Sequence, residues 1–343
     1  MYVINAVNVR DALPKAVRYL LQLGIKEETR YGDVWASRGP VCIHYHIPKQ
    51  HVLVNPVRDA NPFFHLMEAI WMLAGRRDAA FLDNYIKDFG KKFGRDGIIW
   101  DAYGYRWRYM FGDQLAEIIA QLKQNPATRQ CVLQMWNHDL VTNDAKPCNL
   151  VATFRIRNSL LDMTVFNRSN DLVWGCCGAN AVHFAIMQEY VAAMVGIRMG
   201  EYHQISTNLH LYIEHVKLFQ KRMKLLNLSE NLYVELKTPF YEEAVPLVHY
   251  PESFDNEVLE VMEIIDDINK GKPVYEESIT NPFLKDVVLP MAHAHKFYKT
   301  RMTAQALIEI ENVTAEDWRR AGREWIKRRT SVRVTEDAYD QSV

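Results

Sequence analysis

The chain has 343 residues, and 48% of them are hydrophobic, so it is long enough to bury a substantial core. Its 41 basic and 42 acidic residues nearly cancel, which argues against a general affinity for nucleic acid. Any site for an anionic ligand must then be local. We find no apolar run of membrane-spanning length and no secretory signal pattern at the start, so we expect a cytoplasmic protein without membrane contact.

The cysteines predict reduced thiols rather than a disulfide framework, because their number is odd and two of them are adjacent. They are Cys42, Cys131, Cys148, Cys176 and Cys177. The closest approaches to a metal-binding pattern are the His-x-His pairs at 44–46 and 293–295, which are too short to bind a metal without further partners. We therefore expect no metal.

The first third of the chain alternates helical and strand patterns. A run of aromatic residues and glycines follows them, which predicts a loop that could line a flat ligand. In chain order we expect a helix over 11–24, a strand, turn and strand over 30–47 with Arg30 at the start of the hairpin, a helix over 61–74 and the aromatic loop over 81–110.

The rest of the chain predicts more strands and then mostly helices, with a change of texture near residue 230. We expect a helix over 113–124, strands over 131–136, 150–157 and 160–166, and helices over 180–195, 209–226, 256–269, 287–309 and 315–329. We divide the chain into a catalytic domain over 1–235 and a mostly helical extension over 236–343 that packs on the same domain.

Cys148 follows a proline at the start of a predicted strand, where it could be a nucleophile if basic neighbours favour its thiolate. Taken alone, it fits better as a small buried hydrophobic residue. The pair Arg168 and Ser169 offers a planar fork and a hydroxyl that suit a phosphate, although a surface pair at the end of a strand is equally consistent.

Five further positions carry a functional and an ordinary interpretation. A carboxylate at Glu68 inside an apolar helix is costly to bury, unless it lies on the polar edge of that helix. Asn180 could read a heterocycle or cap a helix. His210 and Tyr212, at the start of a predicted helix, could bind a sugar hydroxyl or form a structural pair. Trp100 could stack on a ring or belong to the core.

Read in order, these residues resemble the thymidylate synthase family, which includes pyrimidine nucleotide hydroxymethylases. The resemblance spans about residues 20 to 225, and it depends on the number, order and spacing of the motifs rather than on any one of them. The motifs are Arg30-x-Gly32, Glu68-Ala-Ile-Trp71, Trp100-Asp101, Tyr103-Gly104-x-x-Trp107-Arg108, Asp113-Gln114, Arg129, Trp136-Asn137, Pro147-Cys148, Arg168-Ser169-x-Asp171, Asn180 and His210-x-Tyr212.

The resemblance implies an α/β (α+β) fold of three layers, with a mixed sheet flanked by helices, and a homodimer. It also implies that Cys148 adds to C6 of a pyrimidine nucleoside monophosphate, so that C5 attacks the one-carbon unit of 5,10-methylenetetrahydrofolate, the co-substrate. Cys148, Glu68 and Tyr103 would be catalytic, and Asp171 and Trp100 would contact the folate. The expected nucleotide-binding residues are Arg30, Arg168, Ser169, Asn180, His210, Tyr212 and an Arg129 supplied across the dimer interface.

Several departures from the family pattern lie around the base. Asn149 follows Cys148 where histidine is usual, Gln130 replaces an arginine, and the loop before Asn180 has one extra residue. The usual short C-terminal closure segment is not found either. Because these features bear on the access of water, we expect a deoxyuridylate (dUMP) hydroxymethylase. The alternatives are a divergent thymidylate synthase, a CMP or dCMP hydroxymethylase or methylase, and an inactive nucleotide- or RNA-binding relative.

Overall fold

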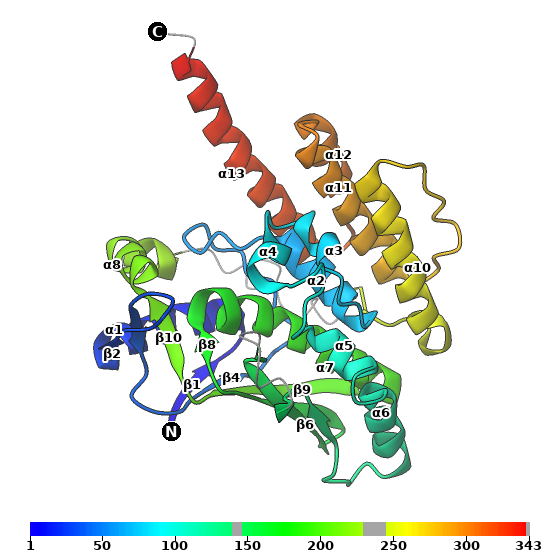
Figure 1. Cartoon of the computed structure of the whole chain (residues 1–343). Helices are drawn as coiled ribbons and strands as arrows, with labels where there is room; N and C mark the ends of the chain where they lie inside the picture. Colours follow the sequence, from blue (N-terminus) through cyan, green and yellow to red (C-terminus); the bar gives the residue numbers. More distant parts are fainter. Residues whose placement is uncertain (139–145, 229–244, 341–343) are drawn as a thin grey trace.

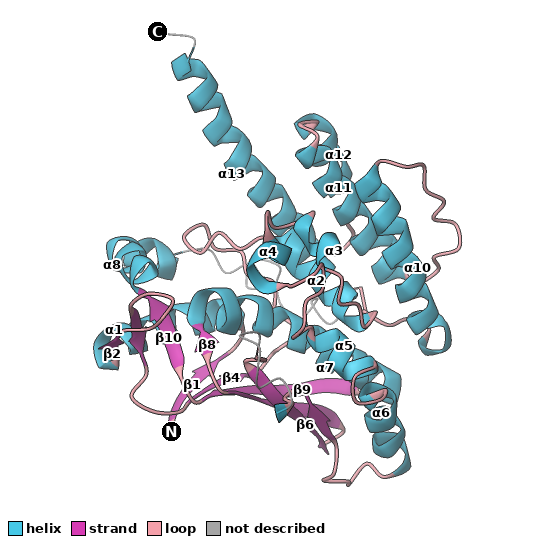
Figure 2. Cartoon of the chain, in the orientation of Figure 1, coloured by secondary structure: helices cyan, strands magenta, loops and turns pink. Residues whose placement is uncertain are grey.

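The main sheet is mixed and has the strand order β1-β4-β9-β7-β6-β5 in the computed structural model, which describes residues 1–138, 146–228 and 245–340. The pairs β1/β4 and β7/β9 are parallel, and the other neighbours are antiparallel. Figure 2 shows the sheet on one side of the molecule. The strands are β1 (Tyr2–Ala6), β4 (Val41–Tyr45), β5 (Val132–Gln134), β6 (Asn149–Arg157), β7 (Leu160–Asn167) and β9 (Arg198–Ser206).

A second, smaller sheet has the order β2-β3-β10-β8. Its strands are β2 (Ile25–Glu27), β3 (Val34–Ala36), β8 (Asn170–Asp171) and β10 (Leu209–Tyr212). Strands β8 and β10 lie in parallel, so the segment that follows β7 is brought beside the segment that follows β9.

Helices form two layers on one face of the main sheet (Figure 1). α1 (Val9–Leu23) and α7 (Asn180–Val195) contact the strands, and α2 (Pro62–Leu73) packs on α7. On the far side of α2 lie α10 (Pro251–Lys270), α11 (Leu289–Lys299) and α13 (Glu316–Asp340), with α12 (Thr303–Glu311) between α11 and α13. The expected three-layer α/β architecture is therefore confirmed.

The sequence explains why α2 and α7 lie in the middle layer. Asn61 caps α2 by accepting a hydrogen bond from the amide of Phe64, and Pro62 occupies the first turn, where its missing N–H costs nothing. Both helices are apolar around most of their circumference, which is typical of helices buried on all sides. Glu68 is the only carboxylate on α2.

Two predictions for the first third of the chain are wrong. The expected hairpin over 30–47 does not form, because β3 pairs with β2 and β10 whereas β4 pairs with β1 and β9. Arg30 lies instead in the turn between β2 and β3. The expected loop over 81–110 contains short helices that bury Phe81, Leu82 and Trp107, namely α3 (Ala79–Asp83), α4 (Phe89–Phe93) and α5 (Tyr103–Arg108).

Two predicted helices of the second half are also divided. The segment 209–226 begins as strand β10 and becomes helix α8 (Ile213–Leu228), because Leu209 and Leu211 alternate as buried residues with the more exposed His210 and Tyr212. The segment 287–309 is split between α11 and α12. The predicted helix over 113–124 forms as α6 (Gln114–Gln124), while the domain boundary at 235 lies outside the described residues.

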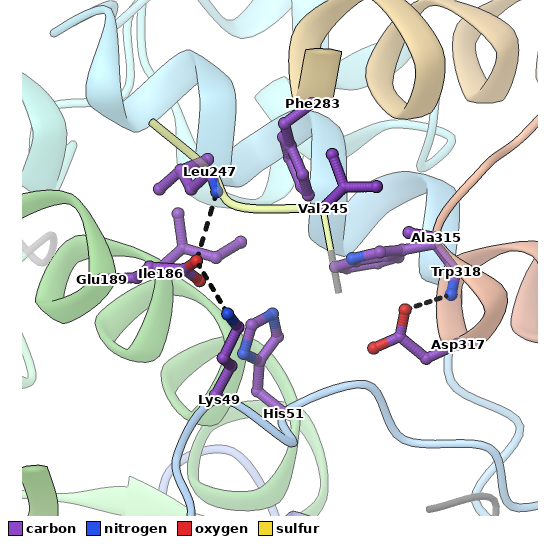
Figure 3. A pocket seen from close by; sticks show the side chains of 10 residues that line it. All are labelled: Lys49, His51, Ile186, Glu189, Val245, Leu247, Phe283, Ala315, Asp317 and Trp318. Carbon is purple, nitrogen blue, oxygen red and sulfur yellow. Dashed lines mark hydrogen bonds and ion pairs between the residues drawn. The ribbon is translucent and has the colours of Figure 1, made fainter. Parts of the chain in front are cut away.

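A small pocket lies where the C-terminal helices meet α7 (Figure 3). Lys49 and Glu189 line one side of it, and Phe283 and Trp318 line the other. The Glu189 carboxylate accepts a hydrogen bond from the amide of Leu247, which ties the segment before α10 to α7. Within the described ranges, no helix is long and apolar enough to cross a membrane.

Candidate functional site

Cys148 lies immediately before β6, at an irregularity in the pairing of β6 with β7. The Tyr103 hydroxyl accepts hydrogen bonds from the backbone N–H groups of Cys148 (3.0 Å) and Asn149 (3.2 Å). Arg168 donates to the carbonyl oxygens of Pro147 (2.9 Å) and Lys146 (2.7 Å). The guanidinium of a predicted anion-binding residue thus holds the segment that presents the thiol.

Burial raises the pKa of the Cys148 thiol, and this effect exceeds the opposing influence of the Arg168 guanidinium. The charge of Asp101 raises the pKa of the thiol further. The free protein therefore holds Cys148 mainly as a thiol. The Arg168 guanidinium is the positive charge that favours the thiolate.

Glu68 of α2 faces α7, and its side chain is 14% exposed. One carboxylate oxygen lies 3.4 Å from Nε2 of His183, which is itself 3.2 Å from the carbonyl oxygen of His65. Burial lowers the pKa of His183 to about 3, so this imidazole is neutral at physiological pH. Burial, with a smaller effect of the Asp101 charge, raises the pKa of Glu68 to about 8. Glu68 is therefore mostly protonated near neutral pH, as a proton donor requires.

His210 and Tyr212 point to the same side of β10, because they are two residues apart in a strand. Their rings meet edge to face, with centroids 5.5 Å apart. Burial raises the pKa of Tyr212, and the charges of Asp171, Tyr31 and Cys148 act in the same direction. Strand β10 pairs with β8, with His210 opposite Asp171, so it carries the expected sugar-binding pair beside the segment that follows Arg168.

The remaining phosphate-binding candidates are distributed over three loops. Arg30 is exposed in the turn between β2 and β3, next to the ring of Tyr31. Ser169 is half-buried and connects Arg168 to β8. Arg129 is exposed on the loop between α6 and β5.

Asn180 is the first residue of α7, and its side chain is buried in a chain of amides. The helix is capped by Ala179, so the N-cap reading of Asn180 is wrong. Its Oδ1 accepts a hydrogen bond from Nδ2 of Asn149 (3.2 Å), and its Nδ2 donates to Oδ1 of Asn170 (3.1 Å). Oδ1 of Asn149 is buried and has no hydrogen-bond partner in the described part of the chain.

Asp171 and Trp100 are the expected folate contacts. One oxygen of Asp171 accepts hydrogen bonds from the amides of Val173 (3.0 Å) and Trp174 (2.5 Å), and the other is buried without a partner among the described residues. Burial raises the pKa of Asp171 to about 6. The Trp100 side chain is 39% exposed, which leaves its ring available to a ligand.

Sequence reasoning missed several residues that hold this arrangement in place. Arg58 is buried, donates to the carbonyl oxygen of Val173 (2.8 Å) and lies 5.0 Å from the ring centre of Trp174. His183 contacts Glu68, and Asp101 influences the pKa of both Glu68 and Cys148. Of these residues, only Asp101 stood inside a recognised motif, Trp100-Asp101. Arg58 and His183 lay outside every motif, so no local pattern in the sequence pointed to them.

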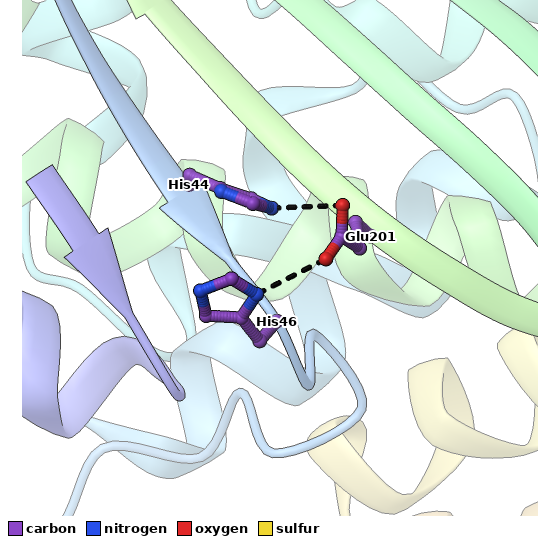
Figure 4. A group of neighbouring side chains, drawn as sticks. All are labelled: His44, His46 and Glu201. Carbon is purple, nitrogen blue, oxygen red and sulfur yellow. Dashed lines mark hydrogen bonds and ion pairs between the residues drawn. The ribbon is translucent and has the colours of Figure 1, made fainter. Parts of the chain in front are cut away.

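Away from this site, His44, His46 and Glu201 form a cluster on the opposite face of the main sheet (Figure 4). Their ligand atoms lie within 4.8 Å of one another, so Glu201 supplies the partner that the His-x-His pair lacked in the sequence. Each imidazole is 3.0 Å from one Glu201 oxygen.

This chain is similar to known proteins over part or nearly all of its length. The model of the thymidylate synthase family matches residues 13–239. A deoxyuridylate hydroxymethyltransferase of Pseudomonas phage M6 is 41% identical over 346 aligned positions, covering 96% of this chain and 95% of that protein. A protein of the same name from Bacillus phage SP01 is 39% identical over 57% of this chain and 56% of its own length.

A more distant likeness is to the thymidylate synthase of Ascaris suum, which is 28% identical over 45% of this chain and 55% of that enzyme. The family model covers well over half of the chain, and its match ends at residue 239, before the C-terminal helices α10 to α13. The chain belongs to the thymidylate synthase family and is a one-carbon transferase.

Proposed function

We propose that this protein is a dUMP hydroxymethylase that works through a covalent bond between Cys148 Sγ and C6 of the pyrimidine. The observation that carries the proposal is the placement of the thiol, which Tyr103 and Arg168 hold at the start of β6. The near full-length likeness to a phage deoxyuridylate hydroxymethyltransferase supports the choice of product.

The nucleotide is expected to lie with its phosphate against Arg30, Arg168 and Ser169, joined by Arg129 of the partner subunit. Bidentate guanidinium groups suit the three phosphate oxygens. His210 and Tyr212 would bind the 3'-hydroxyl from strand β10, and Asn180 would bind the base. These contacts would fix C6 next to Cys148 and so lower the entropic cost of attack.

In the first step, the Cys148 thiolate forms the S–C6 bond and the π electrons move to C5 and O4. C5 then attacks the one-carbon unit and afterwards loses its proton to a base. The C–N bond to tetrahydrofolate breaks with this proton loss, so tetrahydrofolate leaves and an exocyclic methylene remains at C5. Glu68, with a pKa near 8, can donate a proton in its acid form and accept one in its base form. Tyr103 holds the peptide bonds beside the reacting carbon.

The residues expected to bind the folate fit its chemistry. The unpartnered oxygen of Asp171 can accept hydrogen bonds from N–H groups of a pterin, and the exposed ring of Trp100 offers a stacking face. 5,10-Methylenetetrahydrofolate supplies the one-carbon unit when it is bound. Both residues would position it against C5 of the nucleotide.

The product depends on what reaches the exocyclic methylene that forms at C5. Water adds oxygen to this carbon, the electrons pass to O4, and the enolate then expels the Cys148 thiolate to leave a hydroxymethyl group. The proton of the water passes to a base such as Glu68. Hydride would instead give a methyl group. The polar, buried Asn149 beside the nucleophile favours the reaction with water.

We also infer that the protein forms a homodimer through the outer face of the main sheet. Helices α1 and α7 cover the inner face, and no described helix covers the outer one. Phe166 and Val132 are exposed there, 37% and 50% respectively, and large apolar side chains exposed on an uncovered sheet face favour an interface. Such a dimer would allow each subunit to supply Arg129 to the other.

We further assign residues 1–235 to the catalytic domain and residues 236–343 to a helical extension packed on it. Ion pairs support the packing of the extension on the domain, because Arg76 bridges Asp78 and Asp266 of α10. Arg328 and Arg329 of α13 both contact Asp59, which precedes α2. The extension thus rests on the helix that carries Glu68.

The release of tritium from C5-labelled dUMP, with the folate present, tests the covalent mechanism. The wild type should release tritium, and Cys148→Ser should abolish the release. Cys42→Ser is the matched control, because Cys42 is a buried cysteine in β4 outside the site, and it should keep the wild-type rate. A wild type without release, or an active Cys148→Ser variant, would contradict the proposal.

A further inference from the structure

The cluster of His44, His46 and Glu201 on the outer face of the main sheet is built by two neighbouring strands (Figure 4). β4 and β9 pair in antiparallel register, with His44 opposite His203. Residues two apart in a strand point to the same face, so His44 and His46 lie beside His203 and Glu201. Three of these four residues bring their ligand atoms within 4.8 Å of one another.

The surroundings of His44 determine which of its ring nitrogens carries a proton. Nδ1 lies 3.1 Å from Oδ1 of Asn5, which is an acceptor, so Nδ1 carries the proton of the neutral ring. Nε2 then presents its lone pair on the side of Glu201, whose Oε2 is 3.0 Å away. Two electron-rich atoms at this distance repel each other unless a positive charge lies between them.

A proton on Nε2 of His44 does not fill this role well. Nε2 is buried and makes no hydrogen bond with any described residue, because its contact with Glu201 Oε2 lies outside the angular range of a hydrogen bond. Two ligands of one metal ion also lie close together without pointing at each other, because each lone pair points at the ion. Zinc bonds of about 2.0–2.1 Å at the tetrahedral angle place such atoms roughly 3.3 Å apart.

The second imidazole and two neighbouring side chains complete the arrangement. His46 Nδ1 lies 3.0 Å from Glu201 Oε1, close enough for a hydrogen bond that a metal ion would replace. His203 stacks on His44, with ring centres 4.2 Å apart and ring planes 14° apart. Asn5 and His203 therefore hold the His44 ring in one orientation, as the outer partners of metal-binding histidines do.

We propose that His44, His46 and Glu201 bind one divalent transition-metal ion per chain, and that this ion is zinc. Two imidazoles and one carboxylate are a known zinc ligand set, whereas calcium and magnesium take oxygen ligands. The ion would join β4 to β9 in the main sheet. Because the cluster lies on the face through which we infer the dimer, the fourth ligand would come from water or from the facing subunit. The sequence could not predict this site, because Glu201 lies 155 residues after His46.

Calorimetric titration of the tag-free full chain with Zn²⁺, after removal of metal by a chelator, measures the site. The wild type should bind one Zn²⁺ per chain. His46→Ala and Glu201→Gln each remove a ligand and should weaken this binding by more than about 100-fold, the upper effect of losing an outer partner. His293→Ala is the matched control, because His293 also belongs to a His-x-His pair and contacts a carboxylate, that of Glu276 at 2.7 Å. It should bind like the wild type.

Co²⁺ in place of Zn²⁺ reports on the ligands themselves. Imidazole and carboxylate ligands should give d–d absorption without the thiolate-to-cobalt charge-transfer band that a cysteine ligand produces. Asn5→Ala removes only the outer partner of His44, so it should lower the affinity by about 10–100-fold while keeping the d–d bands. This variant separates the orientation of His44 from the loss of a ligand.

Thermal unfolding without metal checks that the variants fold, and they should unfold at the wild-type temperature. Added Zn²⁺ should raise this temperature for the wild type and the control, but not for His46→Ala or Glu201→Gln. A wild type that binds no Zn²⁺, or binding that these two substitutions leave unchanged, would overturn the inference. A thiolate charge-transfer band that persists in His46→Ala would also overturn it. None of these measurements depends on catalysis, so their outcome is separate from that of the proposed function.

Discussion

Glu68 is a carboxyl group inside a helix that is otherwise apolar, and its pKa of about 8 links it to stability as well as to proton transfer. In the unfolded chain this group loses its proton near pH 4.5, whereas in the folded protein it keeps the proton until about pH 8. Between these values, rising pH stabilises the unfolded state. The contribution of Glu68 to folding therefore becomes less favourable as pH rises through this window.

Glu68→Gln should remove this dependence, because glutamine has nearly the same shape and does not ionise. We expect the variant to gain stability over the wild type as pH rises from about 4.5 to 8, by up to a few kcal/mol. Urea unfolding at several pH values measures the difference. A constant difference across this range would show that Glu68 has an ordinary pKa.

Tyr103 is the second residue whose role can be isolated. Tyr103→Phe removes the acceptor for the amides of Cys148 and Asn149, so it should lower stability by about 1–3 kcal/mol and slow tritium release. Tyr105→Phe, on the same helix, is the control and should change neither property. Equal effects of the two substitutions would mean that the hydroxyl of Tyr103 has no special role.

At this scale, the sequence was informative where a residue stands in a recognisable pattern. Cys148, Glu68 and Asn180 were found from motif order and from the cost of burying a carboxylate. The contact of His183 with Glu68 and the hydrogen bonds that join Asn149 to Gln204 through Asn180 and Asn170 could not be predicted, because they join segments that are far apart in the chain.

Among the elements, strand β10 matters most for the nucleotide. Its strand geometry places His210 and Tyr212 on one side, whereas a helix would have turned residues two apart away from each other. The sequence predicted a helix from residue 209, whereas the helix begins at Ile213 and residues 209–212 form β10. The pairing of β10 with β3 and β8, rather than local propensity, decides the outcome.

His210→Ala should raise KM for dUMP by about tenfold, the loss of one hydrogen bond to the sugar, with a smaller change in kcat. A substrate that lacks the 3'-hydroxyl should show little difference between variant and wild type. His249→Ala, on the segment before α10, is the control. If both substrates were affected equally, His210 would not bind the 3'-hydroxyl.

For the whole molecule, the fold class and strands β4 to β7 of the main sheet were accessible from the sequence, because alternating patterns are strong there. Strands β1 and β9 of the same sheet were not predicted, since strand formation depends on distant partners. The sequence also left open how residues 236–343 would pack. The structure shows ion pairs between this segment and the preceding residues, from Arg76 to Asp266 and from Arg329 to Asp59.

Subunit exchange tests the proposed dimer. Arg129→Ala and Cys148→Ser proteins should each be nearly inactive, but a mixed dimer would contain one complete site, so an equimolar mixture should recover about a quarter of wild-type activity. The mixture is measured by tritium release after exchange. The pair Glu68→Gln and Cys148→Ser is the control. Because Glu68 and Cys148 belong to the same chain's site, neither site of a mixed dimer is complete, and this mixture should recover no activity beyond that of the separate proteins.

The central claim concerns the group left on C5. The most direct measurement is the mass of the product from dUMP and 5,10-methylenetetrahydrofolate, followed together with the absorbance of dihydrofolate. We predict 5-hydroxymethyl-dUMP without formation of dihydrofolate. Thymidylate accompanied by an equal amount of dihydrofolate would contradict the account and would identify a divergent thymidylate synthase.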